Sequence, residues 1–340
     1  MNTRLLGGVA LAAMLAVTAC SQSEPAAPEP ETHAETETAA PPSGRVHGVD
    51  TVVPESVGFA SDRLAALDAQ YQALVDEGKL AGYVWLVSRH GQIADFYTYG
   101  VTDYDTQAPM QHDTIFRIAS MTKPVTGVAM MMLYEDGLWQ MDDPVSDYIP
   151  EFADLVVATE DGGTEPMASP MTMAQLMSHS AGFGVSAVYA DNNLQATDLQ
   201  GMIDTLAELP LVSQPGTAWD YGPSVNVQGY IVEKLSGMTL EEFFETRIFE
   251  PLGMDDTGFW VPADQQERVT RIFDYADDGS LFMMDERAQN ESPQFLSGSG
   301  GLFSTPLDYW TFTQMLTHGG ELNGHRLLQP ETVELMRQNV

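Results

Sequence analysis

The alternation of apolar and polar positions predicts an early helix followed by a β-hairpin. Across residues 62–78 the apolar positions recur at helical spacing, and Gly78 suits the end of a helix. Two runs rich in β-branched and aromatic residues follow at 83–88 and 93–99, on either side of the turn residues 89–92. Such runs around a short polar turn predict an antiparallel hairpin.

The rest of the chain is predicted to be mostly helical. Residues 121–136 are apolar on almost every side, which indicates a buried helix. Residues 302–340 contain no predicted strand. Further helices are expected at 172–179, 225–236, Pro306–Thr317 and 330–338. The pattern therefore favours an α+β fold, an antiparallel sheet flanked by helices with a mostly helical inserted region. A lone hairpin is only marginally stable, so we expect partner strands that this chain does not visibly supply.

The amino-terminal residues predict export. Arg4 precedes an apolar run at 5–17, which is too short to span a membrane but has the pattern of a secretory signal. Residues 17–20 (VTAC) resemble the end of a bacterial lipoprotein signal, in which the cysteine is lipidated and becomes the first residue. Cys20 is the only cysteine in the chain, so it cannot form an internal disulfide. Residues 1–20 are thus interpreted as a lipoprotein signal peptide, with plain secretion as the alternative.

The segment 21–44 differs in composition from the rest. It is rich in Pro, Ala, Glu and Thr and has five glutamates and no Lys or Arg. Such a segment cannot bury enough apolar surface to offset the entropy of ordering, so it predicts a disordered acidic tether. Residues 45–340 would then form the folded domain, held by the Cys20 lipid on a membrane and facing the periplasm or the cell exterior.

Composition narrows the partners. The 340 residues are 44% apolar, which is enough for a large core. Forty-nine acidic and 14 basic residues give a net charge of -35, which argues against a nucleic-acid partner because phosphate binding needs clustered cations. The expected partner is a small-molecule ester or amide substrate, for the reasons that follow.

Ser120 and Lys123 are the first candidate catalytic pair. They lie three residues apart at the start of the predicted buried helix, so they share one helix face, and the helix dipole adds partial positive charge there. A serine is a weak nucleophile until a neighbour takes its proton, and a lysine can take that proton or hold another base ionised. With three lysines in the chain, chance would place such a pair in roughly one similar chain in five. A capping serine beside a solvated lysine is therefore the alternative.

The wider sequence resembles the serine hydrolases of the class C β-lactamase, penicillin-binding-protein and family VIII esterase group. The resemblance covers almost everything from Glu55 onward. It rests on six blocks in the family's order: 115–123 (IFRIASMTK), 142–145 (DDPV), 176–183 (LMSHSAGF), 214–221 (QPGTAWDY), 249–254 (FEPLGM) and 300–305 (GGLFST). It implies a β-lactamase/transpeptidase-like fold in which Ser120 is acylated and Lys123 and Tyr221 handle its proton. It also implies an oxyanion site made by the Ser120 amide and a second amide from a sheet strand.

Two departures from the family pattern affect the predicted chemistry. Pro223 stands where the β-lactamase form of the tyrosine motif has Asn, and proline has no side-chain amide to engage a β-lactam or peptide. The family's Lys-Thr-Gly or His-x-Gly motif on a late strand is absent. His318 is followed by two glycines, but the pattern there indicates the end of a helix. The resemblance therefore implies closing strands after residue 340 that this sequence does not contain, and with them the second oxyanion donor.

These observations predict a serine hydrolase that acts on carboxylic esters. A β-lactamase, a D-amino-acid peptidase or amidase, and an acyltransferase remain alternatives, as does an inactive penicillin-binding-like remnant. No phosphate loop, Gly-x-Ser-x-Gly elbow or zinc motif occurs, and no cofactor or metal is expected. His179 is interpreted as a structural hydrogen-bonding residue, and the methionines near Ser120 as core residues.

Overall fold

The computed structural model describes residues 45–46, 49–184, 196–284 and 286–338. The predicted signal peptide, Cys20 and the predicted tether lie outside these residues. Among the described residues, no helix has both the length and the apolar character needed to cross a membrane.

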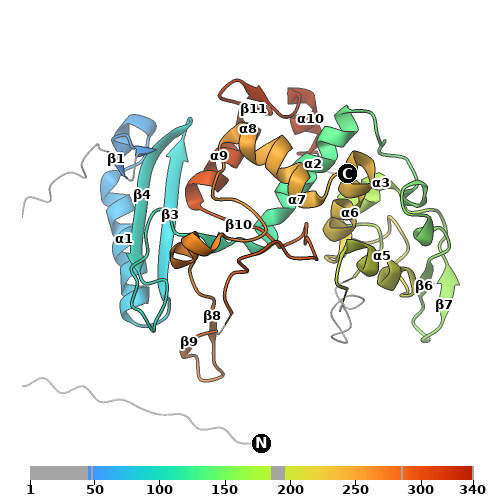
Figure 1. Cartoon of the computed structure of the whole chain (residues 1–340), viewed down its shortest axis with the longest axis horizontal. Coiled ribbons are helices and arrows are strands. Elements are labelled where there is room, and N and C mark those ends of the chain that lie inside the picture. Colours follow the sequence, from blue (N-terminus) through green and yellow to red (C-terminus); the bar gives the residue numbers. More distant parts are fainter. Residues whose placement is uncertain (1–44, 47–48, 185–195, 285, 339–340) are drawn as a thin grey trace, which may run out of the picture. The chain divides into compact units, whose positions relative to one another are not determined.

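The predicted early helix and hairpin are present. Helix α1 (Ser61–Asp76) lies against β4 (Gln92–Gly100), which pairs antiparallel with β3 (Gly82–Arg89), as Figure 1 shows. Gly100 is required here, because its φ is 86° and a Cβ would come within 2.4 Å of the Ala81 carbonyl oxygen. Within the described part of the chain β3 and β4 form a two-stranded sheet. The further strands expected beside them stay a prediction.

The buried central helix is also confirmed, with a different start. The chain first forms the 3-10 turn η2 (Ala119–Thr122) and then α2 (Lys123–Glu135). Pro124 is accommodated because the first turn of a helix needs no donor there. From Val125 onward the helix is almost entirely buried, and Val125, Val128, Ala129 and Met130 have no exposed surface. The helix therefore forms the centre of the main apolar core, which includes the fully buried Trp139 and Phe152.

The middle of the chain is helical, as the pattern predicted. Helix α6 (Ser224–Ser236) packs against α2 and is itself contacted by α3 (Met173–Met177), α5 (Leu199–Ala207) and α7 (Leu240–Phe244) (Figure 1). Helix α3 begins with a capping box between Thr172 and Gln175, which explains its sharp start. The remaining elements are short: β1 (Arg45–Val46), β2 (Val49–Asp50), η1 (Pro54–Val57), η3 (Val145–Asp147), η4 (Pro150–Phe152), β6 (Val156–Ala158), β7 (Thr164–Pro166), η5 (Glu245–Phe249), α8 (Glu250–Leu252), η6 (Ala263–Arg268), β8 (Phe273–Tyr275) and β9 (Leu281–Met283).

The expectation that residues 302–340 contain no strand is wrong. The two predicted helices are there, as α9 (Pro306–Thr317) and α10 (Pro330–Leu335). Between them β11 (Glu321–Leu322) and β12 (His325–Arg326) form a hairpin whose turn residues Asn323 and Gly324 have φ of 52° and 84°. An Asn-Gly pair is the strongest short hairpin signal, and it was present in the sequence.

A third strand in this region lies next to the segment that contains Ser120. β10 (Phe303–Ser304) pairs antiparallel with β5 (Phe116–Arg117), which immediately precedes the 3-10 turn. The Ile118 amide donates to the Leu302 carbonyl at 3.0 Å, which extends this pairing toward Ser120. The glycine-rich segment before β10 is thereby held beside the start of α2.

Candidate active site

The 3-10 turn brings Ser120 and Lys123 together. In a 3-10 helix the side chains at positions i and i+3 lie one above the other. Lys123 Nζ accordingly donates to Ser120 Oγ at 3.0 Å. Ala119, just before the serine, has a φ of 45°, in the left-handed region that costs a non-glycine residue about 1–2 kcal/mol. The amide of Ser120 lies in the first turn, where backbone N–H groups have no acceptor within the helix.

Tyr221 joins the pair from a segment 101 residues further along the chain. Its hydroxyl lies 2.7 Å from Ser120 Oγ, and Lys123 Nζ is 4.8 Å from the centre of its ring. The nearby Lys123 side chain, and after it the Ser120 hydroxyl, lower the pKa of Tyr221 below its ordinary value, while burial opposes this shift. The structure thus brings the three sequence-predicted site residues into one hydrogen-bonded cluster. Their catalytic roles stay a prediction.

The glycine-rich segment 297–301 supplies a further contact that sequence reasoning missed. Lys123 Nζ also donates to the Ser299 carbonyl at 2.7 Å. The segment is held in turn by Asn226, whose Oδ1 accepts from the Ser299 amide at 2.9 Å, and by Thr126, whose hydroxyl donates to the Gly298 carbonyl at 2.7 Å. Both anchoring residues are buried. The sequence signal that could have identified Thr126 and Asn226 is a polar residue on an otherwise apolar face of α2 and of α6.

His179 lies against the tyrosine. Its ring is stacked on Tyr221 with centroids 5.4 Å apart and an interplanar angle of 10°. Its φ of 59° is left-handed, and its Nδ1 has no hydrogen-bond partner among the described residues. Burial, and after it the nearby Lys123 charge, lower the pKa of His179. The predicted hydrogen-bonding role of His179 stays a prediction, and the contact that the structure shows is the packing of its ring on Tyr221.

The structure also shows where Pro223 and His318 lie, the two positions discussed above as departures from the family pattern. Pro223 is buried immediately before α6, and its carbonyl accepts from the Asn226 amide at 2.8 Å. It therefore contributes to the start of the helix and offers no side-chain donor. His318 ends α9, as expected, and its Nδ1 lies 2.7 Å from the Gln314 carbonyl of the same helix.

An apolar groove opens beside Lys123. Its volume is about 560 Å³, and we call it the methionine groove after Met131, Met141, Met177 and Met336. Its other lining residues are Lys123, Pro124, Gly127, Ala174, Ser178, His179, Trp219, Val225, Gln228, Leu335 and Gln338. The groove therefore adjoins Lys123 and His179 and continues along α2 from Pro124 to Met131, while Ser120 and Tyr221 do not line it.

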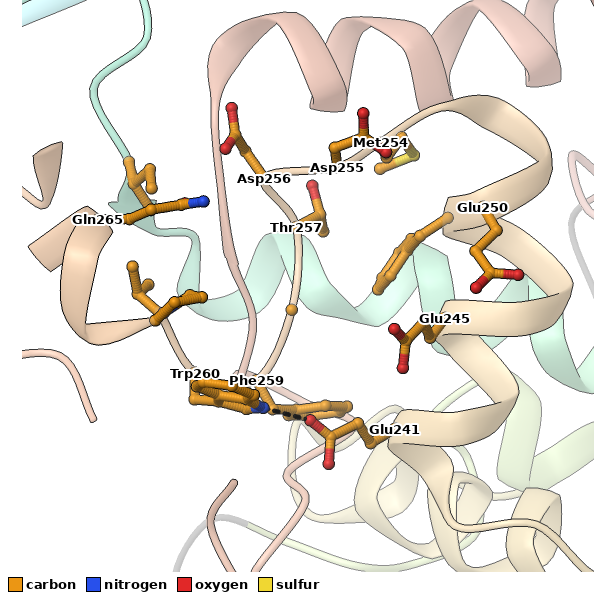
Figure 2. Close-up of a pocket in the computed structure, with 15 residues that line it drawn as sticks. Glu241, Glu245, Glu250, Met254, Asp255, Asp256, Thr257, Phe259, Trp260 and Gln265 are labelled. Atoms are coloured by element: carbon orange, nitrogen blue, oxygen red, sulfur yellow. Dashed lines mark hydrogen bonds between the residues drawn. The ribbon is translucent and has the colours of Figure 1, made fainter. Parts of the chain in front are cut away.

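A second cavity has a different character. It measures about 340 Å³ and is lined by five acidic residues, with Trp260 and Phe259 at one end (Figure 2). Trp260 Nε1 donates to Glu241 Oε1 at 2.6 Å across this end. None of the predicted site residues lines it. Within the described residues no group of three or more His, Cys, Asp or Glu side chains is placed to hold a metal ion.

Known proteins match this chain in sequence and in fold. The model of the family described as Beta-lactamase matches residues 67–340. Protein Rv1367c of Mycobacterium tuberculosis is 35% identical over 79% of this chain and 70% of its own length. The lovastatin esterase of Penicillium rubens is 31% identical over 80% of this chain and 72% of its own. Among solved structures, EstCE1, described as a hydrolase with promiscuous acyltransferase activity, superposes with a TM-score of 0.67 at 25% identity, covering 82% of this chain and 78% of that one.

Proposed function

Since the chain belongs to the beta-lactamase family and carries a hydrogen-bonded serine, lysine and tyrosine, we propose that it hydrolyses carboxylic esters through an acyl-enzyme on Ser120. The α+β fold, with helices and antiparallel strands, is that of the β-lactamase/transpeptidase group. Esterases and acyltransferases among the relatives support a hydrolase. The ester substrate and the serine mechanism are our proposal.

In the first half of the proposed reaction the serine attacks the ester. Ser120 Oγ passes its proton to the Tyr221 phenolate and forms a bond to the carbonyl carbon. The Ser120 amide stabilises the oxyanion, and a second amide from a strand stays a prediction. The bond from carbon to the alkoxy oxygen then breaks, and Tyr221 returns the proton to the leaving alcohol.

In the second half, water takes the place of the alcohol. Tyr221 accepts a proton from water, the hydroxide oxygen bonds to the acyl carbon, and the bond to Ser120 Oγ breaks as the serine regains its proton. Lys123 favours the phenolate form throughout, through its positive charge.

One observation carries this proposal, the contacts of 2.7 Å and 3.0 Å that join Ser120 Oγ to Tyr221 and to Lys123. We expect Ser120→Ala to abolish hydrolysis of p-nitrophenyl acetate and to abolish labelling by a fluorophosphonate probe. Tyr221→Phe and Lys123→Ala should each reduce turnover by orders of magnitude without additivity. Labelling of a different serine, with activity kept in Ser120→Ala, would falsify the assignment.

Pro223 supports esters over amides as substrates. A hydrogen bond to a neutral group contributes about 0.5–1.5 kcal/mol, which is up to roughly tenfold in rate. We therefore expect short p-nitrophenyl esters to exceed nitrocefin or a D-alanyl peptide in kcat/KM by about tenfold or more. Pro223→Asn should narrow that gap. Preference of the wild type for nitrocefin or the peptide over every ester would favour the amide-cleaving alternative.

Acyl transfer is the second candidate function, because an acyl-enzyme partitions between water and other acceptors. The similarity to EstCE1, a hydrolase with promiscuous acyltransferase activity, supports it. Product analysis in water with added alcohol distinguishes the two reactions, since transfer yields a new ester and hydrolysis yields only the acid. Neither product would form if the chain were an inactive penicillin-binding-like remnant.

We also propose that the protein is an exported lipoprotein anchored through Cys20. The support is the signal-like segment at 1–20 and the lone cysteine at its end. Mass spectrometry of the mature protein from its natural host is the test. An unmodified Cys20, or an amino terminus at another residue, would contradict this placement.

A further inference from the structure

The methionine groove is apolar and adaptable. Four of its lining residues are methionines, whose unbranched thioether side chains adjust to irregular ligands. The chain carries 49 acidic residues, yet none of them lines this groove. Its volume of about 560 Å³ lies within the roughly 300–1,000 Å³ typical of small-molecule sites. These features suit an uncharged aliphatic group.

Gly127 is one of the residues that line the groove. It lies within α2, where glycine destabilises a helix relative to alanine. A Cβ at this position would meet no atom within 4 Å, and the residue does not have a positive φ. Neither close packing nor backbone conformation therefore requires glycine here. What glycine leaves at this position is space in the wall of the groove.

The position of Tyr221 indicates which part of an ester would enter. In the proposed mechanism its hydroxyl returns a proton to the leaving oxygen, so the alcohol portion must lie on the Tyr221 side of Ser120. His179, which stacks on that ring, and Trp219, whose ring centroid is 6.0 Å from that of His179, both line the groove. An alkyl chain that continues from the leaving oxygen therefore reaches the groove past these two rings.

We propose that the methionine groove binds the aliphatic alcohol portion of the ester substrate and that Gly127 determines how long that portion can be. This inference rests on the proposed esterase function. By microscopic reversibility the same groove would bind an acceptor alcohol during acyl transfer. The acyl portion lies on the other side of the nucleophile and does not enter the groove.

The experiment measures kcat/KM by acid release for two ester series on the full chain. One series holds the acetyl group and lengthens the alcohol from ethanol to 1-octanol, and the other holds ethanol and lengthens the acid. The wild type should gain about two- to fourfold per methylene in the alcohol series, with fourfold corresponding to full burial. It should gain little in the acid series.

The variants fill the groove from two helices, α2 and α3. Gly127→Leu should abolish the gain along the alcohol series, because the added atoms take up the space that a longer alcohol would occupy. Ala174→Leu, on α3, should do the same and covers the case in which the first variant does not fold. Gly127→Ala should give a smaller loss together with a higher thermal midpoint. Ala69→Leu, on the exposed side of α1, is the matched control and should change neither series.

Three results would overturn the inference. They are a gain along the acid series alone, a flat alcohol series in the wild type, and an alcohol series unaffected by both leucine variants. Failure of the proposed function looks different, as absence of turnover even with ethyl acetate. In that case quenching of tryptophan fluorescence by 8-bromo-1-octanol in wild type, and its loss in Gly127→Leu, still tests the groove, because Trp219 lines it.

Discussion

Replacing Lys123 by methionine removes the ammonium charge but keeps a side chain of similar length. The charge lies 4.8 Å from the centre of the Tyr221 ring. Coulomb's law gives about 3.5 kcal/mol for a full phenolate at that distance with an effective dielectric constant of 20, and about 0.9 kcal/mol in bulk water. The variant should therefore raise the pKa of Tyr221 by roughly 0.6 to 2.5 units. Because 41% of Tyr221 is exposed to solvent, the lower half of this range is expected.

Whether Lys123→Met raises or lowers the activity at a given pH follows from the ionisation state of Tyr221. If the phenolate is the base, activity appears as the pH rises through the pKa of Tyr221, and Lys123 lowers that pKa. Lys123→Met should then move the acid limb of kcat/KM to higher pH. Below both pKa values the rate falls by the same factor as the phenolate fraction, about 4-fold to 300-fold over the range above. A more basic phenolate recovers part of this loss.

The assay is the kcat/KM of p-nitrophenyl acetate measured from about pH 5 to pH 10. Wild type and Lys123→Met should approach each other at the alkaline end. Tyr221→Phe is the control, because it should lack this acid limb altogether. An acid limb at the same pH in wild type and Lys123→Met, with a uniform loss of rate, would refute the reasoning and favour direct proton transfer to the lysine.

Three further results are expected. Burial raises the pKa of Asp308 to about 6 from 3.8, so folding stability should fall by up to about 3 kcal/mol as the pH rises from about 4 to 6. In urea unfolding at pH 4 and pH 8, Asp308→Asn should lose this share of the pH dependence, and an unchanged dependence would contradict the prediction. Asn226→Ala leaves the Ser299 amide without its acceptor, so it should lower the free energy of unfolding by about 1–3 kcal/mol and should also lower kcat. An unchanged free energy of unfolding would exclude an anchoring role for Asn226. His179→Ala should change kcat more than it changes KM. His179→Phe should restore kcat, because it keeps a ring that can stack on Tyr221. An equal loss of kcat in both variants would exclude positioning by stacking.

Local patterns predicted some elements well because those elements depend on short stretches of chain. The helix Pro306–Thr317 was predicted with its observed bounds, since Thr305 caps it and Pro306 begins it. The β3–β4 hairpin followed from residue types on either side of one turn. The β11–β12 hairpin was missed although its Asn-Gly turn was visible, because strands of two residues show no alternation.

The candidate site was predicted only as far as its motifs extend. Ser120 and Lys123 were paired by their spacing, and Tyr221 by resemblance to a family. The carbonyl of Ser299 could not be predicted, because a backbone group carries no residue-type signal. The stacking of His179 on Tyr221 could not be predicted either, because it joins two loops that are far apart in the sequence.

The sequence by itself determined which residues are candidates for the chemistry and that a buried helix follows Ser120. It did so because residue types, helical periodicity and motif order are local properties of the chain. The tertiary structure alone decided that a tyrosine 101 residues away lies 2.7 Å from the serine oxygen. It also decided that the accessible side of α2 at Gly127 opens into an apolar groove. Both follow from how α2, α3 and α6 pack, and packing depends on side-chain shapes that no single segment specifies.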